Sequence, residues 1–139
     1  ADQHDYSDER VWASIPFAPW DADGAITDGG SAIEVPVMVL TGDRDTSTDL
    51  EMVTGMYDPI AVEPRYLGRF LRGGHFSFSP MACEIGLESD NGCGEDDLDL
   101  ERLATLTNVS AVAFLESVRG VSGAIDQLPT DEELVWLVD

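Results

Sequence analysis

VPVMVLTGDRDT, residues 35–46, is an apolar run that stops at a glycine and is followed by two aspartates. Such a run, without alternating polar residues, is typical of a β-strand that is covered on both faces. The pattern returns at residues 65–78, RYLGRFLRGGHFSF, where an apolar strand runs into two glycines and a histidine. VWASIPFA, at residues 11–18, predicts a third buried strand.

Helical patterns lie between and after these strands. Residues 47–57 predict a short helix with a serine or threonine cap, and residues 98–120 predict a long helix. Asp97 or Asp99 caps the long helix and Gly120 ends it. Its predicted apolar stripe consists of Leu100, Leu103, Ala104, Ala111, Phe114, Leu115 and Val118. Strands alternating with helices indicate an α/β fold, and three strands with one long helix indicate part of a larger parallel sheet.

The charge of the chain is extreme. Its 139 residues include 28 acidic and seven basic side chains, a formal net charge of −21, and all seven basic residues are arginine. Nucleic acid is excluded as a partner, because phosphate contacts need a basic surface. No apolar run reaches the roughly 18–20 residues of a membrane span. The acidic, lysine-free composition fits a protein of high-salt surroundings, and it equally fits a GC-rich genome with one acidic loop.

The two cysteines, Cys83 and Cys93, lie ten residues apart in an acidic loop at residues 80–97. This spacing suits a local disulfide, with two separate thiols as the alternative. A disulfide predicts a secreted or periplasmic protein, and the cytoplasm of a salt-accumulating organism is the other location considered. Neither this loop nor residues 21–28 has the spacing of a calcium loop, so no metal or cofactor is predicted.

Two predicted strand ends carry side chains suited to proton transfer. Asp43 and Asp45 follow the second strand, and His75 follows the third. Because neighbouring parallel strands end at the same edge of a sheet, Asp45 and His75 are expected to lie side by side. A carboxylate on one imidazole nitrogen leaves the other nitrogen to take a proton from a nucleophile. Taken alone, His75 is typical of a solvated loop and Asp45 of an aspartate that caps a turn. Gly73 and Gly74 are expected to permit the turn before the histidine.

The motifs PVMVLTGDRDT and GGHFSF closely resemble the C-terminal part of α/β-hydrolases. They are most similar to the branch of dienelactone-hydrolase-like, platelet-activating-factor-acetylhydrolase-like and polyester-hydrolase (cutinase-like) enzymes. In this family the catalytic residues follow the chain order serine, aspartate, histidine. The resemblance implies that Asp45 is the catalytic acid and His75 the catalytic base. Asp43 is expected to make a turn contact beside them.

RVWASIPFAPW, at residues 10–20, resembles the strand after the nucleophile helix in this family. In polyester hydrolases an aromatic side chain near the end of that strand often lines the acyl-binding cleft, which implies a substrate-binding role for Trp20. Phe76 and Phe78 are further candidates for the cleft wall, with packing beneath the histidine loop as the alternative. The resemblance covers about residues 10–120 and implies a small-molecule or polymer ester as substrate.

The nucleophile of the family is missing from this sequence. It belongs in a G-x-S-x-G elbow, which the chain lacks, and GGSAI at residues 29–33 has no second glycine. The resemblance therefore implies the last three parallel strands and the C-terminal helix of an α/β-hydrolase sheet, incomplete without an N-terminal half. Residues 1–139 are then the C-terminal portion of one domain, with a polar arm at 1–10, the acidic loop at 80–97 and a tail at 121–139.

The implied function is that of a serine-type carboxylic ester hydrolase with an acyl-enzyme mechanism. It would be active only when an N-terminal half chain carrying G-x-S-x-G complements this one. A cysteine nucleophile is the alternative within the family, but Cys83 and Cys93 are poor candidates because they follow the histidine. The other class of function is a non-catalytic interaction module that retains the fold. The presence of both Asp45 and His75 favours the enzyme.

Overall fold

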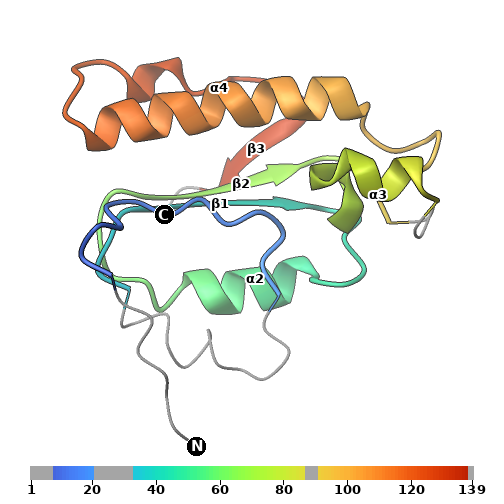
Figure 1. Cartoon of the computed structure of the whole chain (residues 1–139), viewed down its shortest axis with the longest axis horizontal. Coiled ribbons are helices and arrows are strands. Elements are labelled where there is room, and N and C mark those ends of the chain that lie inside the picture. The colour runs from blue at the N-terminus through green and yellow to red at the C-terminus, as the bar shows by residue number, and fades with distance from the viewer. Residues whose placement is uncertain (1–7, 21–32, 87–90, 138–139) are drawn as a thin grey trace, which may run out of the picture.

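The computed structural model describes residues 8–20, 33–86 and 91–137. Within them, a small sheet lies between two helices, with the long helix α4 (Leu100–Val118) on one face and the short helix α2 (Leu50–Tyr57) on the other (Figure 1). This layering belongs to the α/β class. Most of the predicted polar arm and most of the GGSAI motif lie outside the described residues.

Among the described residues, the sheet has three strands in the spatial order β1 (Val37–Gly42), β2 (Arg65–Phe70) and β3 (Leu134–Leu137). β1 and β2 are parallel, and β2 and β3 are antiparallel. The expectation of an all-parallel sheet is therefore wrong. The C-terminal tail at residues 121–139, for which no strand was predicted, supplies β3, which pairs with the second edge of β2.

Residues 11–18 lie parallel to β1 but do not form the predicted buried strand. They make two isolated bridges with β1, through Ser14 and Phe17. Pro16 lies on the edge that faces β1 and has no N–H to donate, so it interrupts the ladder. Of this segment only Ala18 is buried. Its place beside β1 is as expected, whereas its burial on both faces is not.

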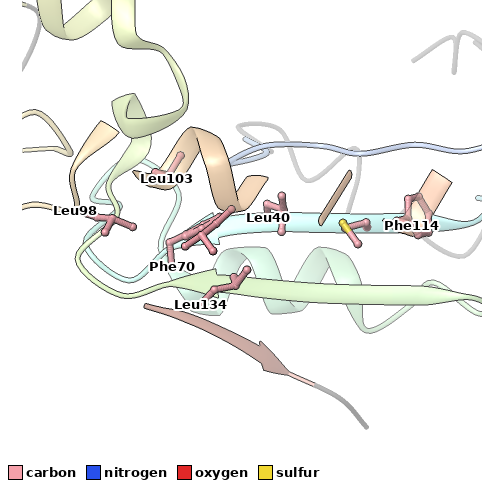
Figure 2. Close-up of a cluster of buried hydrophobic side chains, with 8 residues drawn as sticks. Leu40, Phe70, Leu98, Leu103, Phe114 and Leu134 are labelled. Carbon is pink, nitrogen blue, oxygen red and sulfur yellow. The ribbon is translucent and has the colours of Figure 1, made fainter. Parts of the chain in front are cut away.

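Each face of the sheet holds one apolar cluster. Beneath α4, the side chains of Leu40 and Phe70 from the strands pack with Leu103 and Phe114 from the helix (Figure 2). On the other face, residues of α2 pack against β1 and β2. All six residues of β1 are buried, which confirms the predicted coverage of this strand on both faces. The short helix α2 covers the face of the sheet that the long helix α4 leaves open.

Helix α4 begins and ends close to the predicted positions. At its N-cap, the carboxylate of Asp99 accepts a hydrogen bond from the amide of Arg102 at 2.8 Å. Gly120, with φ of 84°, follows its last turn. The buried face differs from the predicted stripe, because it includes the polar Ser110, whose hydroxyl donates to the Leu106 carbonyl at 2.8 Å. The other buried residues of the helix are Leu103, Leu106, Ala113 and Phe114.

Shorter elements join these layers. Between β2 and α4 the chain forms the 3-10 helix η2 (His75–Phe78) and the helix α3 (Pro80–Glu84). α3 therefore begins in the stretch predicted as an acidic loop. After α4, a second 3-10 helix, η3 (Ile125–Gln127), precedes β3.

The acidic surface makes stability depend on salt. Arginine pairs such as Arg44 with Asp97 and Arg72 with Glu133 neutralise only a minority of the 28 acidic residues. We expect the melting temperature at pH 7 to rise by roughly 5 °C or more between about 0.1 and 1 M NaCl, because the screening length falls from about 10 to 3 Å. Circular dichroism melts measure this rise. The same series at the calculated isoelectric point, pH 4.1, is the control and should respond less. A flat or falling midpoint at pH 7 would contradict the expectation.

Candidate active site

Asp45 and His75 lie side by side at the carboxyl ends of β1 and β2, as the sequence predicts. Oδ2 of Asp45 is 3.0 Å from Nδ1 of His75. The side chain of Asp45 is fully buried, whereas that of His75 is 26% exposed. The pair therefore consists of a carboxylate shielded from solvent and an imidazole ring that reaches the surface.

Four donors surround the carboxylate of Asp45. Oδ1 accepts from the amides of Ser47 and Thr48 at 2.8 and 2.7 Å, and Oδ2 accepts from the Thr48 hydroxyl at 2.6 Å and from His75. An ionised carboxylate only accepts hydrogen bonds, so these donors hold it in one orientation. Thr48 donates to Asp45 and does not cap α2. The N-cap is Asp49, whose carboxylate accepts from the amide of Met52 at 2.8 Å, and not the predicted serine or threonine.

The hydrogen bond to Asp45 assigns different roles to the two nitrogens of His75. Nδ1–H donates to the carboxylate, so Nε2 is the acceptor of the neutral ring. Among the residues that the structure describes, Nε2 has no hydrogen-bond partner. The ring can therefore take a proton at Nε2 from an approaching group while Asp45 stabilises the imidazolium.

The turn before His75 works differently from the prediction. Neither Gly73 nor Gly74 has a positive φ, and the left-handed residue is Arg72, with φ of 64°. The amide of Arg72 donates to Oδ1 of Asp43 at 2.6 Å, so Asp43 makes the expected turn contact. Gly74 is needed for space, because a Cβ there would lie 2.3 Å from the carbonyl carbon of Asn91.

The aromatic candidates occupy different surroundings. The ring of Phe76 packs edge-on against His75, with centroids 5.3 Å apart. The ring of Phe78 packs against those of Phe17 and Phe70, with centroids 5.7 and 5.8 Å apart. This packing agrees with the alternative given for Phe78, a packing role beneath the histidine loop. Trp20 is 66% exposed and has no ring contact with His75 in the described part of the chain. Its role in substrate binding stays a prediction.

The predicted disulfide between Cys83 and Cys93 is confirmed, with Cα atoms 5.3 Å apart. It joins α3 to the segment that follows Asn91. Residues 87–90, between the two cysteines, lie outside the described residues.

Asn91 is a residue of the site that the sequence did not identify. Its side chain is buried, and its Oδ1 accepts from the amide of His75 at 2.9 Å. The Asn-Gly dipeptide at residues 91–92 is a turn signal, but such a signal does not reveal what the side chain binds. The contact is visible only once the chain is folded.

Within residues 8–20, 33–86 and 91–137, no group of three or more His, Cys, Asp or Glu side chains is arranged to hold a metal ion. No helix of the described structure is both long enough and apolar enough to cross a membrane. Comparison with models of protein families, with curated protein sequences and with solved structures finds no match to this chain. The case for a function therefore rests on the geometry of the Asp45–His75 pair and on the sequence motifs around it.

Proposed function

We propose that this chain supplies the acid and the base of a serine-type carboxylic ester hydrolase, and that a second polypeptide supplies the nucleophile. The observation that carries the proposal is the 3.0 Å contact between Oδ2 of Asp45 and Nδ1 of His75. It leaves Nε2 for proton transfer. The resemblance of the flanking motifs to α/β-hydrolases supports the same assignment, with the acid before the base along the chain.

In the proposed reaction, Nε2 of His75 takes the proton of a serine hydroxyl as its oxygen attacks the ester carbonyl carbon. The imidazolium then returns this proton to the departing alcohol, and an acyl-serine remains. Water attacks the acyl group by the same proton path and releases the carboxylic acid. Asp45 keeps the ring in the productive tautomer and stabilises its positive charge throughout.

The free edge of residues 11–18 is where we place the second polypeptide. The edge opposite β1 carries the amides of Ile15 and Phe17, which make no hydrogen bond among the described residues. The side chains of Trp12 and Phe17 are 48% and 45% exposed. An unpaired edge with exposed aromatic side chains favours the addition of a strand.

An apolar hollow supports the same placement. It has a volume of about 240 Å³ and lies between residues 14–19, β1 and α2. Its wall includes Pro16, Val39, Val53 and Met56. A polypeptide that adds a strand at the free edge of residues 11–18 would lie next to this hollow and could bury it.

Substrate and location follow from the same proposal. Phe76, at the ring of the base, and Trp20, two residues beyond the free edge, are the proposed walls for the acyl group of a small or polymeric ester. The disulfide supports a secreted or periplasmic location.

The test uses the protein as it is isolated, with any chain that accompanies it. We expect it to hydrolyse p-nitrophenyl acetate and to be inactivated by a fluorophosphonate, because an activated serine forms a covalent bond with this reagent. Mass spectrometry should find the phosphonate on a serine in a G-x-S-x-G sequence outside residues 1–139. Heat-denatured protein is the control. Labelling of a serine within this chain would contradict the two-polypeptide proposal, and the absence of both turnover and labelling would favour the interaction module.

A further inference from the structure

We infer that Asn91 is a positioning residue that holds the acid and the base in register, and that the Cys83–Cys93 disulfide fixes Asn91 in place. The inference rests on the proposed function, since it concerns the same pair, Asp45 and His75.

Asn91 binds both loops of the site at once. Its side-chain Oδ1 accepts from the amide of Thr46 at 3.2 Å and from the amide of His75 at 2.9 Å. Thr46 directly follows the acid, and His75 is the base. One oxygen atom therefore sets the distance between the two backbone segments that carry the catalytic pair.

Two further hydrogen bonds complete the link. Nδ2 of Asn91 donates to Oγ of Ser47 at 3.0 Å, and the main-chain carbonyl of Asn91 accepts from the amide of Phe76 at 2.9 Å. Asn91 thus makes two hydrogen bonds to the acid loop and two to the base loop. Since Asn91 is only 2% exposed, water does not compete freely for these groups.

The segment around Asn91 has little room to move. The hydroxyl of Ser77 accepts from the amide of Gly74 at 2.9 Å and donates to the carbonyl of Gly92 at 3.1 Å. One residue later, Cys93 is bonded to Cys83, which lies in the helix that follows the base. Hydrogen bonds on one side and a covalent bond on the other therefore hold Asn91 against the histidine loop.

Register matters here because the reaction needs His75 within hydrogen-bond reach of the nucleophile and Asp45 within reach of His75. A displacement of about 1 Å can cost about 100-fold in rate. Asp43 and Arg44 tie the two loops together where the strands end. Asn91 ties them beside the catalytic pair itself.

The kinetic test compares Asn91→Ala, Asn91→Asp and Asn108→Ala in the protein isolated with any accompanying chain. For Asn91→Ala we expect kcat to fall by about 10- to 100-fold with KM nearly unchanged. Asn91→Asp retains oxygens that accept from Thr46 and His75, but it loses the donor to Ser47 and buries a second carboxylate near Asp45, so it should recover only part of the rate. Asn108 is exposed on α4, so its alanine variant is the matched control. If Asn91→Ala unfolds, Asn91→Ser takes its place, because its shorter side chain cannot reach the amides of both Thr46 and His75, and the same loss of kcat is expected.

A second readout reports on the catalytic pair directly. This chain has only two histidines, His4 and His75, so nitrogen-15 labelling of its histidines, with any accompanying chain left unlabelled, gives two ring spectra, with His4 as the internal reference. In the wild type we expect the neutral His75 ring to carry its proton on Nδ1. In Asn91→Ala we expect both tautomers, and in Asn91→Asp the wild-type form. A merely structural role would lower the melting temperature and leave the tautomer ratio unchanged.

A separate variant tests whether the Cys83–Cys93 disulfide holds Asn91 in place. Replacing both Cys83 and Cys93 by serine should lower kcat, by a smaller factor than Asn91→Ala. An unchanged kcat would refute the role of the disulfide in positioning Asn91. If Asp45→Asn is inactive but Asn91→Ala behaves like Asn108→Ala in both readouts, the inference fails and the proposed function stands. If Asp45→Asn is fully active, the proposed function fails, and the tautomer ratio alone still decides whether Asn91 positions the pair.

Discussion

Asp45→Asn and His75→Ala are each expected to lower ester turnover by roughly 1,000-fold or more. His75→Ala removes the group that takes the proton from the nucleophile. Asp45→Asn places an amide where a carboxylate accepts from Nδ1 of His75, so the ring loses the partner that selects its tautomer. Turnover of p-nitrophenyl acetate measures the loss, and thermal melts establish that the variants remain folded.

Asp43→Asn is the matched control for Asp45→Asn. The carboxylate of Asp43 accepts from the amide of Arg72, and the side-chain oxygen of asparagine can accept the same hydrogen bond. We therefore expect a loss of less than about threefold. A loss as large as that of Asp45→Asn would mean that the wrong aspartate has been assigned, and near-wild-type turnover in His75→Ala would remove the acid–base pair altogether.

Residues 1–139 alone are expected to hydrolyse the ester no faster than buffer, and a chain that carries G-x-S-x-G is expected to raise the rate by at least about 1,000-fold. Without a nucleophile no acyl-enzyme can form. The isolated chain should also be poorly folded, because the free edge of residues 11–18, with the exposed Trp12 and Phe17, invites aggregation.

Light scattering and thermal melts with and without the second chain measure this rescue. The His75→Ala form of residues 1–139 is the control, since it should regain its fold on mixing but not its activity. A soluble monomer of these residues alone that melts cooperatively would refute the half-domain hypothesis. A native particle composed only of copies of this chain would refute it as well.

The elements that the sequence predicted well are those with strong local signals. The apolar run before GDRDT is β1, and the apolar run before GGH is β2. Asp45 and His75 come together because each follows one of two neighbouring parallel strands. The two cysteines are bonded because a short spacing already brings them within reach.

The features that the sequence missed depend on partners far away along the chain. Asn91 binds Thr46, 45 residues earlier, and no short motif encodes such a contact. The sequence predicts only a tail where β3 lies, because the partner of β3, β2, lies more than 60 residues before it. Pro16 lies within the apolar run at residues 11–18, and its effect depends on which edge of that segment faces β1. The local pattern of residue types along the sequence does not predict contacts between segments that are far apart in the chain.

The antiparallel pairing of β3 gives the sheet a direction of growth. On one side, the described part of the sheet ends in β3, a strand of four described residues, and very short edge strands are poor templates for further pairing. On the other side it ends in the longer free edge of residues 11–18. A body with two good edges can add copies of itself without limit and form fibres. Among the described residues, the edge of residues 11–18 is the better template, so we expect strand pairing to join two polypeptides there instead of building a filament.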